Sequence, residues 1–93
     1  MIRISASSEF QRAYKRLRRN PDLLLRVDRA LKQLAADPYH ASLKTHVLQG
    51  KLAGAWACSA AYDLRILFKF KAHPETKARE ILLIDLGSHD EVY

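Results

Sequence analysis

The sequence predicts an α+β fold of two layers, in which a mostly antiparallel sheet of four to five strands is covered on one face by a helical hairpin. Two observations lead to this prediction. Hydrophobic residues recur at helical spacing up to about residue 37, and after residue 44 they alternate as they do in strands. The 93 residues contain no repeat and no low-complexity tract. We therefore expect residues 1–93 to form a single domain.

The chain is predicted to begin with a short strand and a helix. Residues 2–5 alternate as a strand does. Ser7 or Ser8 is then expected to cap the helix, with Ser8 and Gln11 at the spacing of a capping box. The apolar stripe of this helix follows the i, i+3, i+4, i+7 pattern through Phe10, Ala13, Tyr14 and Leu17.

A second helix is predicted directly after the first. In Asn20-Pro21-Asp22, the Asn is a favourable N-cap, the Pro fits the first turn, and the Asp complements the helix dipole. Asp37-Pro38 ends the helix. Its apolar stripe consists of Leu24, Val27, Leu31 and Leu34. Because the joint is so short, we expect the two helices to pack as an antiparallel hairpin.

Strands are predicted in the rest of the chain, over residues 45–48, 55–60, 64–71 and 81–86. Glycines mark the link over residues 49–54, and a polar loop covers residues 72–77. In the third of these strands, one set of side chains is expected to pack under the helices: Leu64, Ile66, Phe68 and Phe70. The other set is expected on the far face, which is therefore polar and partly basic: Asp63, Arg65, Leu67 and Lys69.

Composition narrows the class of protein. A hydrophobic fraction of 48% with 28% charged residues is typical of a globular domain. No apolar run approaches the roughly 20 residues that a membrane-spanning helix needs, and the N-terminal segment lacks the apolar stretch of a signal peptide. Cys58 is the single cysteine, so we expect a reducing, cytoplasmic location. Without a second thiol, the four histidines argue against structural zinc, and we expect neither metal nor cofactor.

Positive charge is concentrated in the first third of the chain. Residues 1–32 contain nine basic and three acidic residues, which accounts for the whole net charge of +6. This asymmetry favours an anionic partner, either nucleic acid or an acidic protein. The alternative is that the basic side of the helical hairpin is simply solvated.

A few polar residues are predicted to meet at one end of the far face. His46 lies on the first strand after the hairpin, Asp63 and Arg65 lie at the start of the third, and His89 and Tyr93 follow the last. Two imidazoles, a carboxylate and a cation are enough to cleave RNA without a metal ion. A base takes the proton of the ribose 2′-hydroxyl, an acid protonates the leaving 5′-oxygen, and the cation stabilises the phosphate. Histidine suits both proton roles, because its ordinary pKa lies near neutrality.

Each of these residues also has a structural interpretation. Val92 and Tyr93 can dock on the body of the protein and prevent fraying. His46 can be an ordinary exposed strand residue, and Asp63 can pair with Arg65 or cap a turn. Two further histidines, His40 and His73, are interpreted as having no catalytic role, and Trp56 is interpreted as a packing residue.

Three segments resemble the RelE/ParE toxin superfamily, and the YafQ-type toxins of bacterial type II toxin–antitoxin systems in particular. They are L-x-G-x-x-x-G-x-W from Leu48 to Trp56, Y-D-L-R from Tyr62 to Arg65, and G-S-H-x-x-x-Y from Gly87 to Tyr93. The resemblance extends over nearly the whole chain, because the predicted order of strand, helical hairpin and sheet also fits a RelE-like fold.

The resemblance implies an endoribonuclease that cuts mRNA in the ribosomal A site of the 30S subunit and is neutralised by a cognate antitoxin. By position, His46, Asp63, His89 and Tyr93 match active-site residues of the family. Arg65 matches a strand arginine that is directed at phosphate, and we expect Lys44 and Lys51 to assist it. The basic helical hairpin is then expected to contact ribosomal RNA.

The sequence departs from this branch of the family at two positions. Ser59 stands where a further histidine is found, and Leu64 where a tryptophan follows the aspartate. The reduced set of proton donors leaves two alternatives open. One is a ParE-like inhibitor of DNA gyrase, which acts by protein binding without nuclease chemistry, and the other is an inactive relative that binds an antitoxin.

Overall fold

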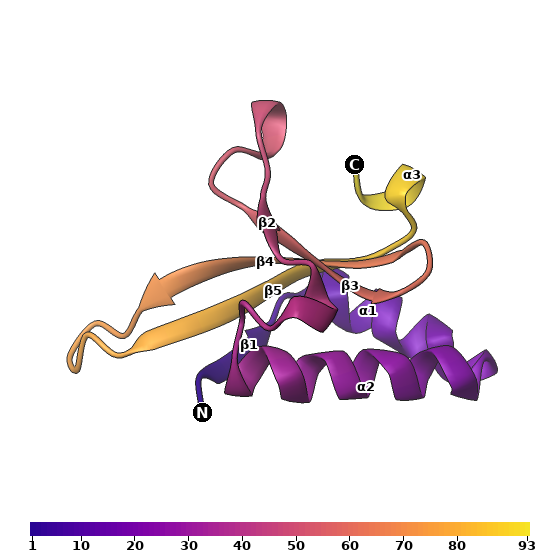
Figure 1. Cartoon of the computed structure of the whole chain (residues 1–93), viewed down its shortest axis with the longest axis horizontal. Helices are drawn as coiled ribbons and strands as arrows, with labels where there is room; N and C mark the ends of the chain where they lie inside the picture. The colour runs from indigo at the N-terminus through magenta and orange to yellow at the C-terminus, as the bar shows by residue number, and fades with distance from the viewer.

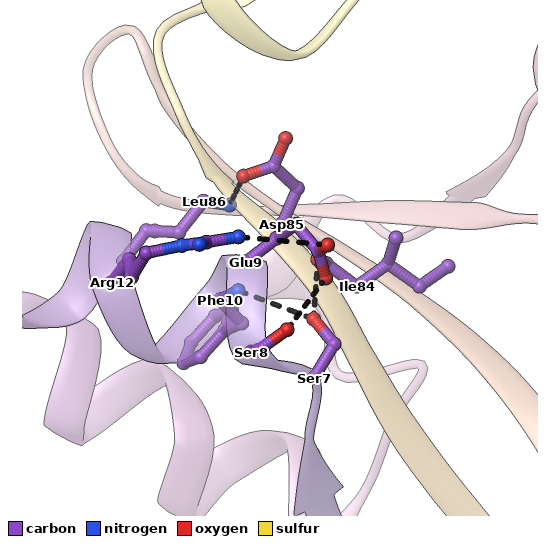
Figure 2. Close-up of polar contacts among 8 residues, drawn as sticks. All are labelled: Ser7, Ser8, Glu9, Phe10, Arg12, Ile84, Asp85 and Leu86. Carbon is purple, nitrogen blue, oxygen red and sulfur yellow. Dashed lines mark hydrogen bonds and ion pairs between the residues drawn. The ribbon is translucent and has the colours of Figure 1, made fainter.

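In the computed structural model, which describes residues 1–93, a serine joins the first strand to the first helix. β1 (Arg3–Ala6) leads into α1 (Ser8–Arg16). The Ser7 hydroxyl oxygen caps the helix by accepting a hydrogen bond from the Phe10 N–H at 3.1 Å. The same hydroxyl donates to the Ile84 carbonyl oxygen at 2.7 Å, so the cap also fastens the helix to the sheet, as Figure 2 shows.

The predicted capping box of Ser8 and Gln11 is wrong. Ser7 is the N-cap, and the Gln11 side-chain amide donates instead to the Ala6 carbonyl oxygen at 3.1 Å. Of the two predicted caps, Ser7 is therefore the correct one, and Ser8 is the first residue of the helix.

The helical hairpin forms as predicted. α1 ends in the short 3₁₀ helix η1 (Leu17–Arg19), and α2 (Pro21–Ala36) begins after Asn20, whose side-chain oxygen accepts from the Leu23 N–H at 3.3 Å. The Tyr14 hydroxyl joins the two helices by donating to Asp28 Oδ1 at 2.7 Å. None of the helices is long and apolar enough to cross a membrane.

Five strands form one mixed sheet in the order β1-β5-β4-β3-β2. The strands after the hairpin are β2 (His46–Val47), β3 (Trp56–Ala61), β4 (Leu64–Ala72) and β5 (Arg79–Gly87). β1 pairs in parallel with β5, and the other pairs are antiparallel. Two 3₁₀ helices, η2 (Ala41–Leu43) and η3 (Gly50–Leu52), flank β2. The strand predicted over residues 45–48 is therefore shorter than expected.

The main core lies between the hairpin and one face of the sheet. It includes Phe10, Ala13, Val27, Leu34, Leu64, Ile66, Phe68, Ile81 and Leu83. This confirms the predicted apolar faces of α1 and β4. On α2 it confirms Val27, Leu31 and Leu34, but Leu23 rather than Leu24 packs against the core, and Ala30 is an additional buried residue. Figure 1 shows both long helices on the same side of the sheet.

The far face of the sheet is only partly open. A short helix, α3 (His89–Val92), follows β5 and lies on the side of the sheet opposite α1 and α2 (Figure 1). Val92 forms a second buried cluster there with Ala57 and Leu67. Leu67 lies on the far face as predicted, but the expectation of an open, polar face is only partly correct, because these side chains form a small core under α3.

Candidate active site

The predicted site residues lie on the far face of the sheet, at the end where α3 and the β2–η3 segment rise from it. In Figure 1, both segments project to the same side, away from the long helices. A hollow of about 340 Å³ lies between them. Its lining residues are His46, Leu48, Gln49, Lys51, Leu52 and Tyr93.

His46 is held by the backbone of the residue two positions before it. Its Nδ1 lies 3.0 Å from the Lys44 carbonyl oxygen. Because a carbonyl only accepts, this hydrogen bond requires the proton on Nδ1 and leaves Nε2 as a free acceptor. Lys44 adopts a left-handed backbone conformation with φ 50°, at the end of η2, which turns its carbonyl toward the ring. In the neutral imidazole, this hydrogen bond leaves the unprotonated nitrogen at Nε2, the atom that a general base uses.

Asp63 connects the β3–β4 turn to α3. Its Oδ1 accepts a hydrogen bond from the His89 N–H at 3.1 Å. Asp63 has a positive φ of 52°, which aspartate tolerates better than most residues. It forms no ion pair with Arg65, since the ion pairs of the chain lie elsewhere. The carboxylate therefore positions the first residue of α3, and pairing with Arg65 is not its role.

His89 and Tyr93 contact each other along α3. Their ring centroids are 4.5 Å apart with the planes at 84°, an edge-to-face arrangement. The Tyr93 N–H donates to the His89 carbonyl oxygen at 3.1 Å. His89 Nδ1 also lies 3.7 Å from Asp90 Oδ1. Tyr93 also lines the hollow that contains His46.

The short helix α3 is held at both ends. Ser88 and Glu91 form a capping box, in which the Ser88 N–H donates to the Glu91 carboxylate at 2.8 Å. This hydrogen bond is the largest cause of the lowered pKa of Glu91, and the Arg16 guanidinium contributes as well. Val92 is buried close to Gly87, where a Cβ atom would come within 3.1 Å of Val92 Cγ1. Gly87 therefore permits the close approach of α3 to the sheet.

Arg65 lies on the same face of the sheet as these groups. It is half-buried on β4, with Ser59 of β3 and Gly87 of β5 as its register partners. Arg65 Nη1 lies 3.5 Å from Ser59 Oγ, which itself donates to the Ala61 carbonyl oxygen at 3.2 Å. The guanidinium is thereby directed toward β3, while the backbone of Arg65 pairs with the last residue of β5.

Of the two predicted lysines, the structure brings only Lys51 into the hollow. Lys44 is exposed and contributes through its carbonyl group. His73 accepts hydrogen bonds from the backbone of the β4–β5 loop, and His40 lies next to Ser42 in η2. Trp56 packs edge-on against Phe70 on the helix side of the sheet, as predicted.

Sequence reasoning missed the docked helix at the end of the chain. The sequence analysis predicts only that His89 and Tyr93 follow the last strand, whereas the structure places His89 as the first residue of α3 and Tyr93 as its C-cap. The signal is nevertheless present, because Ser88-His89-Asp90-Glu91 has the S-x-x-E spacing of a capping box. Nowhere in the chain do three His, Cys, Asp or Glu side chains gather as metal ligands do.

Comparison with known families and structures agrees with this description. The family model "Bacterial toxin of type II toxin-antitoxin system, YafQ" matches residues 2–93. No curated protein has a sequence that matches the chain. YafQ from E. coli strain BL21(DE3) superposes with a TM-score of 0.79 at 17% identity, over 100% of this chain and 99% of that one.

Two further structures are similar. A metal-bound toxin from Helicobacter pylori shares 28% identity and a TM-score of 0.78, over 100% of both chains. The E. coli DinJ-YafQ toxin-antitoxin complex contains a chain with 17% identity and a TM-score of 0.76, covering 99% of this chain and 97% of that one.

Proposed function

Because the chain belongs to the YafQ family of toxins from bacterial type II toxin–antitoxin systems, we propose that it is a ribosome-dependent endoribonuclease that cleaves mRNA by metal-independent acid–base catalysis. The observation that carries the proposal is the placement of Tyr93. It lines the hollow that contains His46 and contacts the ring of His89. Tyr93 thus connects the hollow that contains His46 to a second exposed imidazole, His89, whose ring lies against its own.

The chemistry follows from the state of each group. His46 Nε2 is a free acceptor and takes the proton of the ribose 2′-hydroxyl. The 2′-oxygen attacks phosphorus, and the bond to the 5′-oxygen breaks. His89 donates a proton to that leaving oxygen, which yields a 2′,3′-cyclic phosphate and a 5′-hydroxyl. Asp63 holds the backbone of His89 in place, and Tyr93 stacks on the nucleotide or shares in proton transfer.

Cations beside the hollow stabilise the reacting phosphate. Arg65 is half-buried, held at Ser59, and faces the same side as α3. Lys51 lines the hollow itself. Lys44 does not line it, but it lies two residues before His46 in the chain. Such charges act on the extra negative charge that develops as the 2′-oxygen attacks.

The ribosome supplies the geometry that this small site lacks. Two imidazoles do not by themselves align a flexible single strand for in-line attack, and alignment is worth several orders of magnitude in rate. We expect the decoding centre to bend the message into place. Four basic side chains around a hollow at the end of α1 are suited to ribosomal RNA phosphates: Lys15, Arg16, Arg18 and Arg19.

The second partner that we propose is a cognate antitoxin. The support is the family itself and the E. coli DinJ-YafQ complexes, whose toxin chains share this fold. An antitoxin segment that folds on binding, with acidic and apolar side chains, would complement the basic surface.

The deciding experiment maps cleavage of a defined message on purified ribosomes. We expect cuts within the message only when ribosome and toxin are both present, and none with a His89→Ala variant. If the message stays intact in the presence of ribosomes and the unaltered protein, the proposed nuclease activity is refuted. Inhibition of DNA gyrase supercoiling by the same preparation would support a ParE-like binding toxin instead.

A further inference from the structure

A second hollow lies at the outer edge of β3, between that strand and α2. Its volume is about 300 Å³. Its polar lining comes from three elements: Arg26, Arg29 and Gln33 of α2, Ser42 of η2, and Ser59 of β3. It is separate from the hollow that contains His46, with which it shares no lining residue.

The hollow exists because β2 is short. β2 pairs only with Trp56 and Ala57, so β3 has no strand neighbour beyond Ala57 on that side. The pairing of β3 with β4 is also irregular between Ser59 and Ala61. On α2, Arg26, Arg29 and Gln33 recur every three to four residues and so share one helix face. That face of α2 and the exposed edge of β3 line the same hollow.

The chemistry of the lining is that of an anion site. The lining contains two guanidinium groups, an amide and two hydroxyls, and no acidic residue. Arg29 has no ion-pair partner in the chain, and Arg26 has only the exposed Asp22 at 3.8 Å. Such an exposed pair is weak and easily exchanged. Guanidinium groups form bidentate hydrogen bonds to phosphate oxygens, a geometry that suits a phosphodiester.

Ser59 joins this hollow to the candidate active site. Ser59 is a lining residue of the hollow, and its Oγ lies 3.5 Å from Arg65 Nη1. Ser59 is therefore a shared neighbour of the hollow and of the Arg65 guanidinium. We propose that the hollow binds a backbone phosphate of the message strand adjacent to the one that is cleaved. This inference rests on the proposed function, since it deepens the description of the same substrate.

The test measures binding of a labelled single-stranded RNA oligonucleotide to the full chain over a range of salt concentrations. All proteins carry His89→Gln to prevent cleavage. We expect the double variant Arg26→Gln, Arg29→Gln to bind about tenfold more weakly. The slope of log K against log salt should become shallower by about 0.7 for each phosphate that the protein no longer neutralises.

The matched control is the double variant Lys71→Gln, Lys77→Gln, which also removes two charges, from the end of β4 and the loop after it, outside both hollows. It should leave both the affinity and the salt slope near those of the parent. Because Arg26 and Arg29 are exposed, the double variant should keep the thermal unfolding midpoint of the parent. Unchanged RNA binding by a folded double variant would overturn the inference.

Two more probes identify the source of the anion. Loss of affinity for vacant 30S subunits, without loss for the oligonucleotide, would assign the hollow to ribosomal RNA and overturn our assignment. If the double variant loses only its binding to a poly-glutamate peptide, the hollow is a site for an acidic protein, and our assignment to message RNA is overturned. Cleavage is tested separately with His89 restored: a chain that binds RNA through this hollow but does not cut the message on ribosomes would refute the proposed function and leave this binding site standing.

Discussion

The Asp63 carboxylate accepts a hydrogen bond from the His89 N–H at 3.1 Å, across 26 positions of the chain. This hydrogen bond ties the β3–β4 turn to the first residue of α3. It also explains how an exposed imidazole can be held in place without being buried, because the backbone rather than the ring is fixed.

Asp63→Ala should lower both stability and cleavage. The variant loses the acceptor for the His89 N–H and places alanine at a positive φ, which together cost about 2 kcal/mol. Asp63→Asn keeps an acceptor oxygen and tolerates the same backbone conformation. Urea unfolding and ribosomal cleavage assays of both variants test this, and equal stability of the two would contradict the positioning role.

His89→Ala should abolish growth arrest and leave the fold intact. The side chain is exposed, so the free energy of unfolding should change little. Loss of a general acid lowers the rate by about 10²–10⁴-fold. His73→Asn serves as a control, because His73 lies in the β4–β5 loop and asparagine preserves its hydrogen-bonding role there. A folded His89→Ala variant that remains fully toxic would eliminate His89 from the mechanism.

Deletion of residues 90–93 should also detoxify the protein. It removes Tyr93 from the hollow and Val92 from its cluster with Ala57 and Leu67. Tyr93→Phe separates the two roles of the tyrosine, since it keeps the edge-to-face packing and removes only the hydroxyl. If stacking dominates, this variant should cleave within about tenfold of the parent. Unchanged cleavage by the truncated chain would remove the tail from catalysis.

The attachment of α3 should weaken in acid. The Ser88 N–H lowers the pKa of Glu91 below its usual 4.5 in the folded protein. A lowered carboxyl pKa contributes stability that is present above 4.5 and is lost as the pH falls through the folded value. The Tyr93 ring signals in NMR spectra should therefore shift below about pH 4.5, before global unfolding. Glu91→Gln should remove this transition, and its persistence in that variant would assign it to another group.

Much of the fold could be predicted from the sequence because its signals are local. The helix stripes, the Asn20 cap and the alternation in β4 each depend on residues close together in the chain, and each is confirmed except for Leu24 in the stripe of α2. The short β2 could not be predicted, because its length is set by pairing with Trp56 and Ala57 rather than by its own residues.

The site was harder to predict in its details. The sequence indicates which residue types are present at the end of the sheet, and the resemblance to a known family indicates their roles. It does not reveal that Lys44 acts through a carbonyl, since this depends on a left-handed backbone conformation. Nor does it reveal that Ser59 borders the second hollow and Arg65 at once, which requires both β3 and α2 in place.

The parallel pairing of β1 with β5 has a consequence for biosynthesis. Ile4 is a register partner of Ile81, and β1 has no other strand neighbour. During translation, β1 therefore emerges first and waits until β5 has left the exit tunnel. α3, which follows β5, emerges later still. The five-stranded sheet therefore cannot be completed on the ribosome before residues 79–87 have left the tunnel.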